Sequence, residues 1–145
     1  MPMVATDDGE VRSSGVLGGE ITVLDEAECR DLLHDAVIGR VAFTAAELTI
    51  HPVSYEWTSD LVVIRTRSTS MLAGAVGQQV AFEVDDIDPE TGVAWSVLVR
   101  GRLEQGAPPL GDSIIPWADG PRHHVLVIAP TRLTGRAVSR PEEDR

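Results

Sequence analysis

The chain has 145 residues, enough for one domain with a sizeable core, and carries a formal net charge of -11 at pH 7. So acidic a protein is not expected to bind nucleic acid or an anionic membrane surface. Its 12 basic residues are all arginines, which excludes lysine Schiff-base chemistry and a P-loop lysine.

Cysteine usage and hydropathy predict a cytoplasmic protein. The single cysteine, Cys29, cannot form an intramolecular disulfide, which fits a reducing compartment. No apolar run is long enough to span a bilayer, and the N-terminus has no secretion-signal pattern. Composition also predicts a flexible leader at residues 1–19, one folded domain at 20–139 and a frayed tail at 140–145.

The first predicted element is a helix. Asp25 and Glu28 have the spacing of a capping box, and apolar residues then recur on one helical stripe. The stripe comprises Cys29, Leu32, Leu33, Ala36 and Val37, and Gly39 is expected to end the helix.

Strand patterns follow. The alternation around Val41 and Phe43 predicts one strand, and residues 48–57 predict a second. His51-Pro52 interrupts that second strand, which indicates an edge position or a bulge. A turn at Ser59-Asp60 then leads into a strand at 61–66, which completes a hairpin.

The rest of the chain predicts a short helix followed by more strands. Ser68 or Thr69 is expected to cap the helix, which carries Met71, Leu72, Ala75 and Val76. Strands are predicted at 80–84, 93–103, 124–129 and 133–138, and a single helical turn at 113–117. The fold class is therefore mainly β: a six- to seven-stranded antiparallel barrel with short peripheral helices.

The segment Arg65-Thr66-Arg67-Ser68-Thr69-Ser70 is a candidate anion site. Guanidinium groups bind phosphate through paired donors, and a helix N-terminus attracts anions. In the alternative interpretation, the hydroxyls only cap the helix and the turn is solvated.

Ordered motifs along the chain resemble a known family. They are Gly39-Arg40-Val41-Ala42-Phe43, Pro52-Val53-Ser54-Tyr55, Ile64-Arg65-Thr66, Val80-Ala81-Phe82-Glu83-Val84-Asp85 and Trp95-Ser96-Val97-Leu98-Val99-Arg100-Gly101. Together they resemble the pyridoxamine 5′-phosphate oxidase-like flavin-binding split-barrel proteins, in the small actinobacterial and nitroimidazole-resistance-like branch. The resemblance implies a split barrel and a homodimer with FMN, or the deazaflavin F420, in clefts at the interface.

The resemblance also implies site residues. Arg65 and Thr66 match the phosphate end of the cofactor, while Ser70, Met71 and Leu72 lie where the family shows Gly-Ser-Lys-Leu. The strand segment Pro52, Val53, Ser54 and Tyr55 matches the one beside the isoalloxazine ring. Trp95 and Ser96 match a strand that lines the cleft, often from the partner subunit.

Three positions depart from the family pattern. Met71 replaces the usual lysine, Thr69 stands at the preceding glycine-like position, and Ser54 stands where asparagine is frequent. Methionine cannot neutralise a phosphate, so Arg67 is the candidate to compensate.

The resulting hypothesis is an FMN-binding protein that acts as an oxidoreductase on an unknown small molecule. The alternatives are an F420-binding reductase and a cofactor-free dimeric binding or sequestering module, so enzymatic activity stays open. No metal site is expected: His123 and His124 point to opposite faces of a strand, and the acids at 85–90 fail the EF-hand spacing. Trp57 and Trp117 are expected to pack in the protein.

Overall fold

The computed structural model describes residues 4–5, 11–12, 20–67, 69–106 and 124–139. In these parts the elements are β1 (Val4–Ala5), β2 (Val11–Arg12), β3 (Glu20–Leu24), α1 (Glu26–Asp35), β4 (Ile38–Thr44), β5 (Leu48–Ser54), β6 (Glu56–Thr58), β7 (Leu61–Thr66), the 3₁₀ turn η1 (Ala73–Ala75), β8 (Gln79–Ile87), β9 (Ala94–Gln105) and β10 (His124–Ser139).

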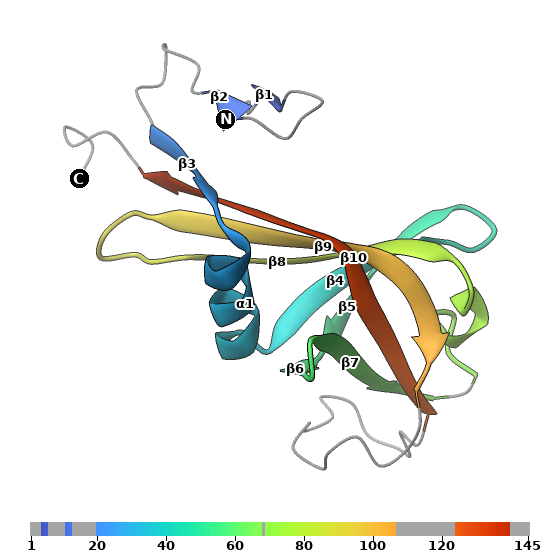
Figure 1. Ribbon diagram of the computed structural model, residues 1–145. Coiled ribbons are helices and arrows are strands. Elements are labelled where there is room, and N and C mark those ends of the chain that lie inside the picture. Colours follow the sequence, from blue (N-terminus) through green and yellow to red (C-terminus); the bar gives the residue numbers. More distant parts are fainter. Residues whose placement is uncertain (1–3, 6–10, 13–19, 68, 107–123, 140–145) are drawn as a thin grey trace.

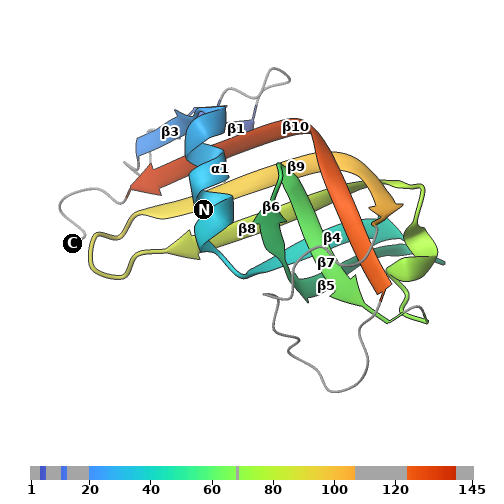
Figure 2. The same cartoon turned by 60° about the horizontal axis from the view of Figure 1, so that its bottom comes forward.

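Eight strands form one antiparallel sheet in the order β5-β4-β8-β9-β10-β7-β6, with β3 paired to β10 (Figures 1 and 2). The two ends of this order, β5 and β6, are consecutive in the chain and join at Tyr55. The sheet therefore curls back on itself, which confirms the predicted antiparallel split barrel. The proline-containing β5 is an end strand, as its interrupted pattern indicated.

Beyond the barrel, the long strands β9 and β10 continue as an arm together with β8 and β3 (Figure 1). α1 lies across one face of this arm, where Cys29 and Leu33 are fully buried. The other face of the sheet, which points away from α1 and from the core and runs from the arm across β8 and β4 to β5, is called the outer face below. It carries the exposed apolar side chains of Val23, Ile38, Leu48, Ile50 and Ile87.

The start of α1 is as predicted, but its end is not. The Asp25 side chain accepts from the Glu28 amide at 2.8 Å, and the Glu28 carboxylate accepts from the Asp25 amide, so the capping box is present. The helix ends at Asp35 because Ala36 is extended, at φ -84° and ψ 163°. Gly39 lies instead inside β4, where a Cβ would sit 2.4 Å from the Phe82 ring. The lack of a side chain at Gly39 lets the Phe82 ring pack against the β4 backbone. The prediction that Gly39 ends the helix was wrong.

The prediction of a short helix after residue 69 was also wrong. Only the 3₁₀ turn Ala73–Ala75 forms, and Ser70 Oγ accepts from the Ala73 amide at 3.1 Å. So short a turn aligns few peptide dipoles, and we attribute no anion attraction to it. The predicted cap Ser68, the turn at 113–117 and Trp117 lie outside the described residues.

Two further differences concern the strands. β3 was not predicted, and the last two predicted strands are one strand, β10, with an irregularity between Pro130 and Arg132. β1 and β2 pair with each other inside the predicted leader. The rest of residues 1–19 and the predicted tail at 140–145 lie outside the described residues.

Candidate functional site

The last residues of β7 form one end of the candidate site. Side chains alternate along this strand, so Thr66, 7% exposed, faces the core, whereas Arg65 is half-buried on the opposite face. Across from Arg65 on β10 lies Val125. Arg67 follows the strand and is exposed.

A tight turn places the next site residues beside Arg67. The Ser70 amide donates to the Arg67 carbonyl at 3.0 Å, and the Ser70 hydroxyl is held by the Ala73 amide. Met71 is 54% exposed, whereas Leu72 is buried in the core. The end of β7 together with this turn is called the corner below. It comprises Arg65, Arg67, Ser70 and Met71, and the buried side chain of Leu72 holds the turn against the core.

The β5 segment divides between two faces of the sheet. Pro52 and Ser54 lie opposite Arg40 and Ile38, with their side chains on the outer face. Val53 packs against the core. Tyr55 is buried, and its hydroxyl donates to the Leu33 carbonyl at 2.6 Å. The side chain of Tyr55 therefore ties the barrel closure to α1 and belongs to the core.

This geometry makes a prediction for Tyr55→Phe. The substitution leaves the Leu33 carbonyl without its buried donor, which is expected to lower the free energy of unfolding by about 1–3 kcal/mol. Burial also raises the pKa of Tyr55 above its ordinary value of 10.0. The wild type is therefore expected to lose stability above pH 10, where the unfolded chain ionises at this residue and the folded one does not. Urea unfolding at pH 7 and pH 11 checks both points. Tyr55→Phe must have a lower free energy of unfolding than the wild type at pH 7, and that free energy must fall less than the wild type's between pH 7 and pH 11.

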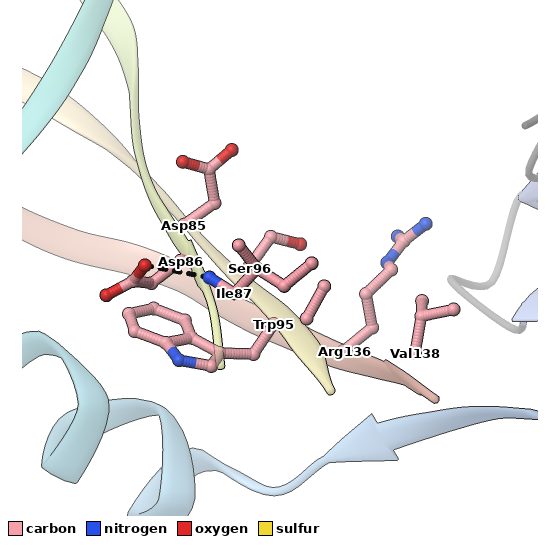
Figure 3. Close-up of a pocket in the computed structure, with 8 residues that line it drawn as sticks. Asp85, Asp86, Ile87, Trp95, Ser96, Arg136 and Val138 are labelled. Carbon is pink, nitrogen blue, oxygen red and sulfur yellow. Dashed lines mark hydrogen bonds between the residues drawn. The ribbon is translucent and has the colours of Figure 1, made fainter. Parts of the chain in front are cut away.

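Trp95 and Ser96 lie at the opposite end of the molecule, in the arm. They line a pocket of about 430 Å³ with Asp85, Asp86, Ile87 and Arg136 (Figure 3). This volume is within the range of small-molecule sites. Ser96, Asp85 and Arg136 project on the outer face, whereas Trp95 and Asp86 project to the other side, toward α1 (Figure 3). Trp95 also packs against the core, as does Trp57, for which packing was expected.

The two groups of predicted site residues are far apart in one protomer. Arg65 lies opposite Val125 of β10, and Ser96 lies opposite Arg136 of the same strand. The eleven steps between Val125 and Arg136 span roughly 35 Å along the strand. One small ligand cannot reach both groups within a single protomer.

Charged side chains cross the outer face between these two ends. Arg40 of β4 binds Glu83 of β8, with Nη2 to Oε1 at 2.6 Å, and also pairs with Asp85. Burial raises the pKa of Glu83, and the Arg40 guanidinium opposes that rise. Ser96 lies directly across the ladder from Asp85, so this network reaches the edge of the pocket.

Sequence reasoning missed Arg136, Asp85 and Glu56 as residues of these surfaces. Glu56 of β6 lies across from Val63, and its Oε2 is buried without a hydrogen-bond partner in the described part of the chain. The available indication was an acid inside the apolar strand pattern around Trp57. The sequence around Arg136 and Asp85 gave no such indication, because only strand pairing brings these two residues to the same pocket.

Other site types find no support in the described ranges. These residues contain no group of three or more histidine, cysteine, aspartate or glutamate side chains that could hold a metal ion. Nor do they contain a helix long and apolar enough to cross a membrane.

A family model described as pyridoxamine 5′-phosphate oxidase matches residues 25–137. The chain belongs to this family. The match runs from the N-cap of α1 to Ala137 in the last part of β10, and so includes every predicted site residue. The resemblance of the ordered motifs is thereby confirmed, while the assignment of single residues to a cofactor stays a prediction.

Three relatives illustrate the similarity. The uncharacterized protein Rv0080 of Mycobacterium tuberculosis is 34% identical over 139 residues, covering 88% of this chain and 91% of that protein. The FAD binding protein from Mycobacterium smegmatis is 30% identical, with a TM-score of 0.65 over 81% of this chain and 98% of that one. A protein from Corynebacterium glutamicum, described as a candidate pyridoxamine 5′-phosphate oxidase, is 27% identical, with a TM-score of 0.72 over 84% and 96%.

Proposed function

We propose that this family member is a homodimeric flavin-binding protein that takes FMN and acts as an oxidoreductase on a small molecule. One similar structure is an FAD binding protein, and FAD contains the riboflavin phosphate unit of FMN. The flavin would supply hydride or electron transfer, and the protein would hold and orient it and exclude water.

The observation that carries the proposal is the polar corner at the end of β7. This chain of net charge -11 places two arginines there, Arg65 and Arg67, and a backbone hydrogen bond from the Ser70 amide to the Arg67 carbonyl brings Ser70 next to Arg67 in the turn. Guanidinium forks and hydroxyls are suitable donors for a phosphate monoester, so the residues present fit the group.

The distance between the corner and the Ser96 pocket supports a site shared by two protomers. In a two-fold dimer, the corner of one copy can meet the pocket of the other, because an isologous interface brings opposite ends of the same surface together. The exposed apolar side chains of the outer face, including Ile38 and Ile50, are suited to burial in such an interface. Each protomer would then contribute half of each of two sites.

F420 is a less suitable cofactor for this chain. Its polyglutamate tail is anionic, and a protein of charge -11 offers it little long-range attraction. The other candidate function is a dimeric binding or sequestering module without a cofactor. It is favoured by one observation: exposed Met71 stands where the family has a lysine.

Ligand titration of the purified protein tests the proposal. We expect a yellow protein with flavin absorbance, or a colourless protein that quenches the fluorescence of added FMN at a ratio of one flavin per chain. FAD and F420 are titrated in parallel, and tighter binding of F420 than of FMN would make the reductase alternative the better account. Failure to bind any of the three would leave the cofactor-free module.

Met71→Lys is expected to strengthen FMN binding. A lysine at this exposed position adds a charged donor to the corner, which corresponds to roughly a tenfold lower Kd for FMN. Riboflavin, which has no phosphate, should bind Met71→Lys and the wild type equally. Met71→Ala is the control and should leave both ligands unaffected. An FMN affinity that does not respond to Met71→Lys would mean that the phosphate lies elsewhere.

A further inference from the structure

The pocket in the arm is a groove whose floor consists of small side chains. On the outer face its middle strand, β9, contributes Ala94 and Ser96. Asp85 of β8 and Arg136 of β10 flank Ser96 in one cross-strand row, which is polar (Figure 3). The next row, roughly 7 Å along the strands, is apolar and comprises Ile87, Ala94 and Val138. A ligand in this groove therefore meets a polar half and an apolar half side by side.

Arg136 is a half-buried cation of this groove, and no other described residue forms an ion pair with it. Asp85, the acid of its own row, pairs instead with Arg40, which also binds Glu83. In a chain with 23 acidic and 12 basic residues, a guanidinium that lines a pocket without a carboxylate partner is unexpected. Because Asp85 is engaged by Arg40, the donors of Arg136 are left for a ligand.

We propose that Arg136 binds the pyrimidine end of the flavin ring and holds the reduced ring more tightly than the oxidised ring. This inference rests on the proposed flavin function, with the phosphate in the corner of one protomer and the ring in the groove of its partner. The ring has the same division as the groove: a pyrimidine with two carbonyl groups and one N–H at one end, and a dimethylbenzene at the other. The polar row suits the pyrimidine, and the apolar row suits the dimethylbenzene.

The charge of the reduced ring gives Arg136 its preference. Reduction of a flavin adds two electrons and one proton, which binds N5, so at neutral pH the ring becomes an anion with its charge shared by N1 and the C2 carbonyl. The guanidinium of Arg136 then forms a charge-assisted hydrogen bond with an anion, whereas the oxidised ring is neutral. Donors aimed at a site where charge develops stabilise that charge. The carboxylate of Asp85, in the same row, acts in the opposite direction.

Two substitutions of opposite sign test this inference. Arg136→Gln removes the cation but keeps amide donors, so we expect oxidised FMN to bind within about twofold of the wild type and reduced FMN roughly tenfold more weakly. Since a tenfold ratio corresponds to about 30 mV for a two-electron couple, the midpoint potential of bound FMN should fall by about 30 mV. Asp85→Asn removes the anion of the row and should raise that potential above the wild type's.

Fluorescence titration gives the affinity for oxidised FMN, and anaerobic titration of the FMN-loaded protein with dithionite gives the midpoint potential. Arg132→Gln is the matched control, because it removes the same charge from an exposed position four residues earlier in β10 and should leave the potential unchanged. Riboflavin is titrated in parallel. It has the same ring without the phosphate, so Arg136→Gln should lower its midpoint potential by the same amount.

Each other result overturns the inference. If Arg136→Gln and Arg132→Gln have the same midpoint potential, Arg136 does not lie at the pyrimidine end, and the flavin function itself stands. Equal weakening of oxidised and reduced FMN would make Arg136 a binding residue without a preference for either form. A shift with FMN but none with riboflavin would place Arg136 at the phosphate, and an Asp85→Asn potential below the wild type's would contradict the charge argument. A wild type that binds neither flavin overturns both this inference and the proposed function.

Discussion

Arg65→Ala is expected to weaken FMN binding by roughly ten- to a hundredfold. A guanidinium–phosphate hydrogen bond contributes about 1.5–3 kcal/mol, and each 1.4 kcal/mol corresponds to about tenfold in Kd. Arg65 is the half-buried cation of the corner, whereas Arg67 is exposed and better screened by solvent. Fluorescence titration with FMN measures the loss directly.

Two controls make this result specific. Riboflavin has no phosphate, so its affinity should be the same for Arg65→Ala and the wild type. Arg132→Ala removes the same charge from an exposed position of β10 and should leave FMN binding within about twofold of the wild type. If Arg65→Ala and Arg132→Ala bind FMN equally well, the end of β7 does not hold the phosphate.

Ser96→Phe is expected to block flavin binding from the other end of the molecule. Ser96 lines the pocket in the arm from the outer face, and a phenyl ring there fills space that the ligand would need (Figure 3). A clash of this kind costs about 1–3 kcal/mol, which is roughly ten- to a hundredfold in affinity. Because Ser96 is remote from Arg65 within a protomer, such a loss requires the pocket of one copy to reach the ligand of another.

Asp31→Phe provides the matched control for added bulk. Asp31 is exposed on α1, which covers the opposite face of the arm. Both variants must keep the molecular mass in solution and the circular dichroism spectrum of the wild type. Flavin binding that survives Ser96→Phe unchanged would confine the site to one protomer.

Most of the fold follows from local patterns. The capping box of Asp25 and Glu28 and the alternation in β8 and β9 are short-range features, so sequence alone located them. Gly39 was misinterpreted because its reason is a long-range contact with Phe82. β3 was missed because its pairing with β10 is formed by residues more than 100 positions away.

The site was less predictable than the fold. Arg67 and Ser70 are joined by one turn, and the residue types at 65–70 alone indicated an anion site. Side-chain direction was not available from the motif: Tyr55 and Leu72 match family positions but are core residues here. The unsatisfied Glu56 depends on strand register and burial, which only a structure provides.

A mixed dimer tests the shared site most directly. Arg65→Ala and Ser96→Phe chains, each with its own affinity tag, are co-expressed, and the dimers that carry both tags are isolated. One of the two sites in such a dimer combines an intact corner with an intact pocket, so we expect about one FMN per two chains, bound with wild-type affinity. Dimers of either variant alone should remain essentially empty at the same FMN concentration. A mixed dimer that is as empty as its parents, or the failure of the two chains to associate at all, would contradict a flavin site built by two protomers.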